Sequence, residues 1–344
     1  MKENREARSE ALPAHAQLIQ MATAHIVSRM VYAAAKLSLA DHLAGGPKSA
    51  AELAGPTRTH ELSLHRLMRA LASLGILSED TEHRFALTSL GEALKNGAPG
   101  SARATILTVA GDTMWRVWEH ILYCLETGKT GMEKQFGMTL FGYLAEHPQE
   151  SSYANEAMIG FHGAEPVAVA AAYDFSGCKT VVDVGGGTGN LLATVLERYP
   201  NIRGILADQP HVVREAPALI ESRGLADRVT IEAIDFFKSV PAGGDAYLLS
   251  HIIHDWNEDE CLTILGNCRK SMKPGSRMLI IEMVLPAGNT SHPGKLSDIA
   301  MLVIAGGQER TEEEYGTLLS KAGLRLTQVV TTESAVSLVE AVPV

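Results

Sequence analysis

Residues 251–256, HIIHDW, place two histidines three positions apart and follow them with an aspartate and a tryptophan. Histidines bind metals, accept protons during catalysis, or pack in the core. The spacing does not match the HExxH pattern of helical zinc sites, and no cluster of cysteines or histidines supplies further ligands. His251 belongs to a strand-like run and is expected to pack there. His254 follows at the start of an acidic loop, so we expect it to belong to a functional site rather than to the core, and we expect that the protein requires no metal.

A glycine-rich stretch, VVDVGGGTGN at residues 181–190, is a second candidate site. It puts Gly185, Gly187 and Gly189 between a buried strand and a helix, where the absence of Cβ atoms lets the backbone approach a ligand. The free N–H groups of the helix N-terminus favour polar groups there. A dinucleotide-binding loop would have another glycine at position 190, which is Asn190 here. The loop therefore favours a nucleoside ligand without pyrophosphate, such as S-adenosylmethionine, over NAD.

Acidic residues in and after the predicted strands support a nucleoside site. Asp208 closes the second strand about 20 residues beyond the glycines, where a carboxylate can accept both ribose hydroxyls. Asp235 closes the third strand and precedes Phe236, so a carboxylate and a ring can hold the adenine together. Asp183, inside the first strand, is placed to face a ligand's ammonium group or to brace the loop. Such carboxylates also cap helices, but two of them on consecutive strands favour ligand binding.

A particular scaffold is needed to bring these motifs together. From about residue 178 the strand-like runs KTVVDV, IRGILAD, RVTIEAID, DAYLLSHI and RMLIIEMVL alternate with helical or loop segments, and LRLTQVVTT and VSLVEAVPV follow. This pattern predicts an α/β fold with a Rossmann-like, doubly wound, seven-stranded sheet. The last two strands are too close for a crossover helix and must pair antiparallel. The region before it is mainly helical, and its helix, turn, helix and β-hairpin outline a winged helix.

Composition narrows the classes of function. The chain has 344 residues, of which 46% are hydrophobic, and a net charge of −10, which argues against nucleic acid or anionic membranes as partners. The charged N-terminus lacks the apolar core of a secretory signal, and no apolar run is long enough to cross a membrane. We therefore expect a cytoplasmic protein.

The motifs GMTLFGYL, VVDVGGGTG, ADQPHVV, HIIHDWNEDE, IIEMVLP and GGQERT resemble, in order and spacing, those of plant caffeate-type and bacterial small-molecule O-methyltransferases. The resemblance spans nearly the whole chain, and HDW together with GGQERT is its most specific part. It implies S-adenosylmethionine as cofactor, an aromatic small molecule as substrate, and a homodimer. It also implies three parts: a winged-helix dimerisation domain at 1–100, a helical connector at 101–165 that contributes to the substrate pocket, and an S-adenosylmethionine-binding domain at 166–344.

The same resemblance assigns site residues. The expected cofactor contacts are Asp183, Gly185, Gly187, Asp208, Gln209, Asp235, Phe236, Ser250 and Trp256. Plant members commonly have a lysine where this chain has Ser250, so that contact is either lost or made by the serine hydroxyl. His254 is expected to be the base, flanked by Glu282 and Glu309.

This chemistry suits these residues. Methyl transfer to oxygen is an in-line displacement, so the protein must supply position and a base. A phenol has a pKa near 10, and a histidine near its ordinary pKa of about 6.5 is mostly free base at neutral pH. A carboxylate on the other ring nitrogen, from Glu282 or Glu309, would fix the tautomer.

The acceptor pocket is less readable from the sequence. The candidates Trp115, Met158, Phe161 and His162 lie on predicted helices. Methionine and aromatic residues at helical spacing also occur in ordinary cores. The resemblance favours a flat clamp on an aromatic ring, for which the adaptable methionine side chain is suited.

Two other functions remain open. The winged-helix outline also occurs in DNA-binding regulators, but residues 1–100 hold 11 Lys and Arg against 10 Asp and Glu, whereas a DNA-binding face should be basic. The same fold and cofactor could instead serve N-methylation or a reaction without methyl transfer. The presence of His254, Glu282 and Glu309 favours proton removal from oxygen.

Overall fold

The computed structural model describes residues 12–98 and 100–344. They form two compact units, one from the described residues up to Trp115 together with His147–Phe161, and the other from Arg116–Glu146 together with His162–Val344. This division cuts across the expected connector at 101–165. In the described ranges no helix is both long and apolar enough to cross a membrane.

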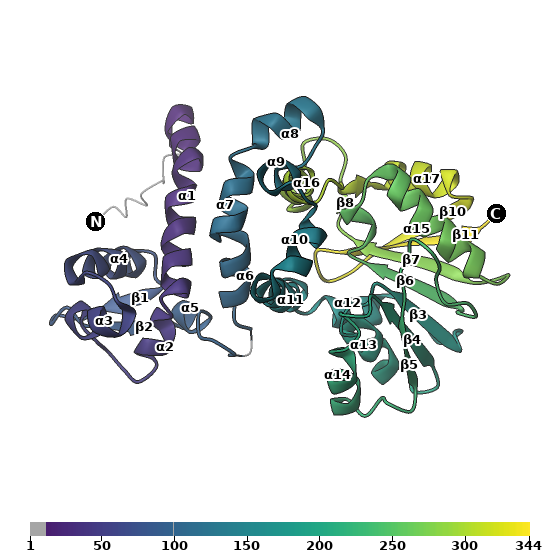
Figure 1. Cartoon of the computed structure of the whole chain (residues 1–344), viewed down its shortest axis with the longest axis horizontal. Helices are drawn as coiled ribbons and strands as arrows, with labels where there is room; N and C mark the ends of the chain where they lie inside the picture. The colour runs from purple at the N-terminus through teal and green to yellow at the C-terminus, as the bar shows by residue number, and fades with distance from the viewer. Residues whose placement is uncertain (1–11, 99) are drawn as a thin grey trace, which may run out of the picture. The chain divides into compact units, whose positions relative to one another are not determined.

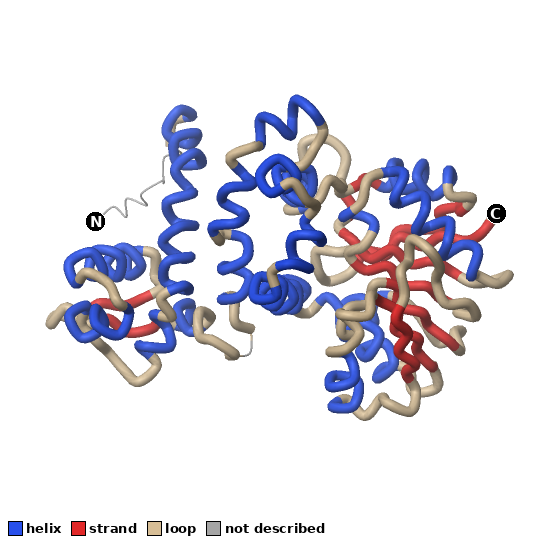
Figure 2. Tube along the Cα trace, in the orientation of Figure 1, coloured by secondary structure: helices blue, strands red, loops and turns tan. Residues whose placement is uncertain are grey.

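The first unit is mainly helical and contains one small hairpin (Figure 2). Its elements are α1 (Ala14–Lys36), α2 (Leu39–Leu43), α3 (Ala50–Thr57), α4 (Glu61–Ser73), β1 (Leu77–Glu79), β2 (Phe85–Leu87), α5 (Ser89–Glu92), α6 (Arg103–Val109), most of α7 (Asp112–Trp118) and most of α11 (Pro148–His162). Helix α4 buries Leu64, Met68 and Leu71, whose spacing puts them on one helical face. The antiparallel β1–β2 pair follows it, as the sequence predicts.

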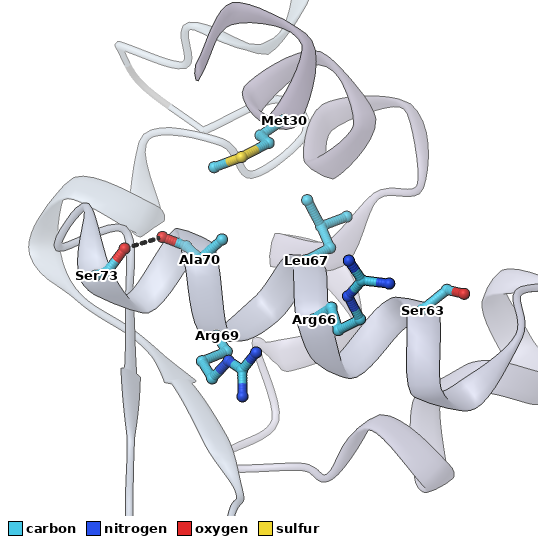
Figure 3. Close-up of a pocket in the computed structure, with 7 residues that line it drawn as sticks. All are labelled: Met30, Ser63, Arg66, Leu67, Arg69, Ala70 and Ser73. Atoms are coloured by element: carbon cyan, nitrogen blue, oxygen red, sulfur yellow. Dashed lines mark hydrogen bonds between the residues drawn. The ribbon is translucent and has the colours of Figure 1, made fainter. Parts of the chain in front are cut away.

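An open groove runs along α4 and is bounded on another side by Met30 of α1 (Figure 3). Its volume is about 580 Å³, and it is lined by Met30, Ser63, Arg66, Leu67, Arg69, Ala70 and Ser73. This lining contains neither a carboxylate nor a histidine, so the groove is not a candidate for proton transfer.

The second unit is the predicted α/β fold. Its helices are α8 (Ile121–Thr127), α9 (Gly131–Phe136), α10 (Leu140–Glu146), α12 (Glu165–Ala172), α13 (Asn190–Arg198), α14 (Ala216–Ser222), α15 (Glu258–Ser271), α16 (Gly294–Ile304) and α17 (Glu312–Lys321). Its main strands are β3 (Thr180–Val184), β4 (Arg203–Asp208), β5 (Val229–Ala233), β6 (Ala246–Ser250), β7 (Arg277–Glu282), β10 (Leu324–Thr331) and β11 (Ser337–Pro343). They form one sheet in the order β10-β11-β7-β6-β3-β4-β5. Strand β11 runs antiparallel to both of its neighbours, β10 and β7, and all other neighbouring pairs are parallel. The predicted sheet, including its antiparallel last pair, is confirmed.

Helices cover both faces of this sheet (Figure 1). One apolar cluster joins α12, α13 and α14 to one face, and a second joins α15 and α17 to the other. Residues alternate between the clusters along each strand: Val181 enters the first, while Val182 and Val184 enter the second. Burial on both faces explains why these strands are uniformly apolar.

A second, two-stranded sheet lies beside the end of β7 and positions Glu309. Strand β8 (Val284–Leu285) pairs parallel with β9 (Arg310–Thr311) just after β7 ends. This pairing brings Glu309, which precedes β9, close to Glu282 at the end of β7. Residues 27 positions apart in the chain thus reach the same edge of the main sheet.

Candidate active site

The glycine loop between β3 and α13 has the backbone that the sequence predicts. Gly185, Gly187 and Gly189 have φ values of 72°, 61° and 87°, in the left-handed region that glycine tolerates best. A Cβ at Gly187 would meet nothing within 4 Å, so its surroundings are open. A Cβ at Gly185 would lie 2.4 Å from Ile252 Cδ1. The loop therefore packs directly against the residue two positions before His254.

Asp208 is tied to this loop by backbone hydrogen bonds. The Gly187 N–H donates to Asp208 Oδ2 at 2.8 Å, and the Gln209 N–H donates to Oδ1 at 2.6 Å. Burial raises the pKa of Asp208, and these two N–H groups oppose the rise. Each carboxylate oxygen keeps a second lone pair that can accept a ligand hydroxyl. Gln209 itself is exposed beside this carboxylate.

Asp183 is fully buried beneath the loop. A Cβ at Gly186 would lie 2.5 Å from its carboxyl carbon. Within the described residues neither of its oxygens has a hydrogen-bond partner. Burial, and then the negative charge of Asp208, raise the pKa of Asp183 to about 7. A buried carboxyl group without partners is costly, and its place under the glycine cradle fits a site built to receive a polar, cationic ligand.

Aromatic rings line the other side of the sheet edge. Trp256 stacks on Phe141 of α10 with centroids 5.1 Å apart and meets Phe237 edge-on at 4.8 Å. Phe236 is buried in the core beside them, and a Cβ at Gly185 would lie 3.6 Å from its ring. Of the two phenylalanines that follow Asp235, Phe236 is the proposed cofactor contact, and Phe237 is the more exposed.

Asp235 and Ser250 occupy less enclosed positions. Asp235 lies two residues beyond β5 rather than closing it, accepts from the Phe237 N–H, and pairs with Lys238 Nζ at 2.9 Å. The Lys238 ammonium group holds the pKa of Asp235 below its usual range. Ser250 is the last residue of β6 and is partly buried at the same sheet edge.

His254 and Glu309 form a buried dyad. His254 lies in the 3₁₀ turn η1 (Ile253–Asp255), and its Nδ1 is 3.0 Å from Glu309 Oε1. Ser297 Oγ of α16 donates to the same oxygen at 2.8 Å, and the Glu309 N–H donates to Asp298 Oδ1. The other nitrogen, Nε2, lies 3.7 Å from Asp255 Oδ1. The carboxylate on Nδ1 leaves Nε2 as the nitrogen that can exchange a proton with an acceptor.

The acidic surroundings change the charge of His254. Burial lowers its pKa, but the carboxylates of Asp255, Glu309 and Glu282 outweigh burial and raise it to about 10. Burial raises the pKa of Asp255 to about 6, with His254 opposing the rise. Burial would also raise the pKa of Glu309, but hydrogen bonding and the charge of His254 lower it. The pKa of His254 is therefore raised above the ordinary value assumed from the sequence, because three carboxylates surround the ring.

Glu282 contacts the backbone of the turn rather than the imidazole. Its Oε1 accepts from the N–H groups of Ile252, Ile253 and His254 at 3.1, 2.6 and 3.1 Å. Of the two carboxylates proposed for the ring nitrogen, the structure puts Glu309 there.

His251 does not lie in the strand as expected. Strand β6 ends at Ser250, and His251 takes a left-handed φ of 54° that turns the chain out of the sheet. Its Nε2 lies 2.8 Å from Glu165 Oε2, and its ring centroid is 5.3 Å from that of His254. Sequence reasoning missed this second carboxylate–histidine pair, since Glu165 is 86 residues away and follows no motif.

The candidate acceptor residues lie mostly outside this unit. Met158 on α11 is 43% exposed. Trp115 on α7 lies over the guanidinium of Arg29, which is 4.9 Å from its ring centroid. The side chains of Phe161 and His162 lie outside the described residues. Among the described residues, no group of three or more His, Cys, Asp or Glu side chains is placed to hold a metal ion.

Comparison with known proteins identifies the family to which the chain belongs. The model of an O-methyltransferase domain matches residues 118–325, and that of an O-methyltransferase dimerisation domain matches residues 19–96. A phenazine O-methyltransferase from Lysobacter antibioticus is 42% identical over 98% of both chains. An 8-amino-8-demethylriboflavin N,N-dimethyltransferase from Streptomyces davaonensis is 33% identical over 86% of both.

A solved relative carries the cofactor. The structure of an O-methyltransferase from neocarzinostatin biosynthesis, in complex with S-adenosylmethionine and 2-hydroxy-5-methyl naphthoic acid, has a TM-score of 0.81. It is 30% identical, and the match covers 92% of this chain and 96% of that one. The chain therefore belongs to the O-methyltransferase family, and it is an S-adenosylmethionine-dependent methyltransferase of secondary metabolism.

Proposed function

We propose that the protein transfers the methyl group of S-adenosylmethionine to a phenolic hydroxyl of an aromatic small molecule, with His254 as general base. The buried His254–Glu309 dyad carries this proposal. It lies at the carboxyl edge of the parallel strands, where ligands bind in open α/β sheets. Ile252, two residues earlier, packs on Gly185 of the glycine loop, so base and cofactor loop are neighbours.

The raised pKa of His254 suits a phenol. The two groups have matching affinities for a proton, since the pKa of His254 is about 10 and that of a phenol is also near 10. When a phenol is hydrogen-bonded to neutral His254, the proton between them can therefore move from the phenol to the imidazole at little cost in free energy. The move converts phenol and neutral imidazole into phenolate and imidazolium, with no change in the number of protons. Glu309 stabilises the imidazolium form, and such assistance contributes about 10²–10⁴ in rate.

The cofactor residues are proposed from the geometry of the loop. When bound, S-adenosylmethionine supplies the electrophilic methyl group. Gly185 and Gly187 would let it approach the backbone, and Asp208 would accept its ribose hydroxyls. Asp235 with Phe236 would hold the adenine, and Asp183 would offset its positive charge from beneath the loop. Gln209, Ser250 and Trp256 complete the proposed lining.

The quaternary arrangement follows from the family. We propose a homodimer formed through residues 1–100, with the segment 101–165 contributing Trp115, Met158, Phe161 and His162 to the acceptor pocket. Residues 166–344 then bind the cofactor.

A screen with methyl-labelled S-adenosylmethionine tests the proposal. The panel should contain hydroxyphenazines, hydroxynaphthoates and aminohydroxybenzoates, with the labelled atom identified by NMR. Label on a phenolic oxygen, lost in His254→Ala, supports the proposal. Label on nitrogen in the aminohydroxybenzoates alone would favour N-methylation, the reaction named for the riboflavin relative.

A further inference from the structure

The turn that holds His254 is fixed on its N–H side by one carboxylate. Glu282 is fully buried, and its Oε1 accepts the three successive N–H groups of residues 252–254. Three converging backbone donors stabilise an ionised carboxylate and leave little freedom to the backbone that carries them.

The second oxygen of Glu282 is held by a tyrosine. Tyr315 of α17 is fully buried, and its hydroxyl donates a short hydrogen bond to Glu282 Oε2. Burial, followed by the negative charge of Glu282, raises the pKa of Tyr315 well above its ordinary value. The hydroxyl therefore stays a donor across the working pH range, and both oxygens of Glu282 are bound to the turn and to Tyr315 rather than to the imidazole.

The carbonyl side of the same turn is held by a buried cation. Arg310 is only 3% exposed, and its Nη1 donates to the carbonyls of Ile253 and Gln308 at 3.2 and 3.1 Å. The Cys261 thiol also donates to the Ile253 carbonyl at 3.2 Å. Gly307 closes the arrangement, because a Cβ there would lie 1.9 Å from the His254 carbonyl oxygen.

We infer that Glu282, Tyr315 and Arg310 are positioning residues, a buried clamp that fixes the backbone of residues 252–254 and thereby the approach of the His254 imidazole to the acceptor. The inference rests on the proposed role of His254. It assigns Glu282 no contact with the reacting atoms: its effect on catalysis passes through the turn. A base displaced by about 1 Å loses on the order of 10² in rate, so a rigid turn matters even where no proton passes through it.

Tyr315→Phe tests the clamp, since it removes one hydroxyl and little volume. Tyr247→Phe is the matched control: Tyr247 is also fully buried, and its hydroxyl donates to the Ser271 carbonyl, away from the turn. With the fastest acceptor of the panel, we expect kcat of Tyr315→Phe to fall about 10- to 100-fold. KM for the acceptor, Kd for S-adenosylmethionine and the pH at which kcat/KM rises should stay as in the wild type, since the substitution leaves Glu309 and Asp255 beside the imidazole in place.

Amide hydrogen exchange measured by mass spectrometry supplies a second readout that needs no acceptor. In Tyr315→Phe, the amides in peptides covering residues 252–254 should exchange at least about tenfold faster than in the wild type. In Tyr247→Phe, their exchange rate should equal that of the wild type. Wild-type exchange at the turn in Tyr315→Phe would overturn the clamp, as would equal kcat losses in the two variants. If His254→Ala stays fully active, the proposed base is wrong; if only Tyr315→Phe stays active, the clamp alone is wrong.

Discussion

His254 Nδ1 and Glu309 Oε1 lie 3.0 Å apart, and the Glu309 side chain is inaccessible to solvent. The other oxygen of Glu309 has no hydrogen-bond partner among the described residues. The hydrogen bonds of the carboxylate side chain therefore go to the imidazole and to Ser297. Because the two side chains are in direct contact, the protonation of His254 and that of Glu309 depend on each other.

Replacing Glu309 by glutamine should separate orientation from charge. The amide oxygen can still accept from Nδ1, but the negative charge is lost, so the imidazolium is less stable and the pKa of His254 falls. We expect kcat to decrease about 10- to 100-fold, with the rise of kcat/KM moving to lower pH. Stopped-time assays between pH 6 and 10 measure both effects, and an unchanged kcat would exclude Glu309 as the partner of the base.

The activity of the wild type should increase with pH. The pKa of His254 is about 10, so the free protein carries an imidazolium at pH 7 and loses its proton as the pH rises. With saturating S-adenosylmethionine, kcat/KM should therefore climb between pH 7 and 9. A profile that is flat above pH 7 would mean that the carboxylates do not raise the pKa of the base.

The same shift affects stability. The folded-state pKa of about 10 exceeds the unfolded value of about 6.5, so protonated His254 stabilises the fold fully below pH 6.5. This contribution is lost as the pH rises toward 10. The difference in unfolding temperature between wild type and His254→Ala should shrink over this range, and a difference that grows instead would have the wrong sign.

Asp183 should make the fold less stable at high pH. Its folded pKa of about 7 lies above the unfolded value of about 3.9, so the native state binds the proton more tightly, and stability falls as the pH rises from about 4 to about 7. Asp183→Asn removes this titration at nearly constant volume. Over this range the unfolding temperature of Asp183→Asn should vary less with pH than that of the wild type. Parallel curves for the two proteins would show that ionisation of Asp183 does not destabilise the fold.

Gly307→Ala should damage the catalytic turn. Backbone atoms of residues 254 and 255 occupy the space that a Cβ would need, so the turn must move. We expect methyl transfer to fall by about 10²-fold while the Kd for S-adenosylmethionine changes little. Gly266→Ala, where a Cβ meets nothing within 4 Å, is the control.

Residues with a periodic or local signal were predicted well from the sequence. The apolar strand runs and the glycines after KTVVDV predicted the sheet and the glycine loop that follows β3, because both depend on neighbours in the chain. His254 and Glu309 were both named, yet only folding could decide between Glu309 and Glu282 for the ring nitrogen.

The remaining features depend on long-range packing. The short β8–β9 pairing brings Glu309 to the base. Tyr315 looks like an ordinary helix residue in the sequence, and the GGQERT motif that contains Arg310 does not show which backbone atoms Arg310 contacts. The raised pKa of His254 was not predicted either, because it depends on how deeply folding buries the ring together with Asp255, Glu309 and Glu282.

The most direct test of His254 as the base compares His254→Ala with the wild type in two measurements on the same preparations. Calorimetry should give a Kd for S-adenosylmethionine within about threefold of the wild-type value. Labelled methyl transfer to the best phenol should fall by about 10²–10⁴ at pH 8. Retention of wild-type transfer across pH 7 to 9, with intact cofactor binding, would contradict the account.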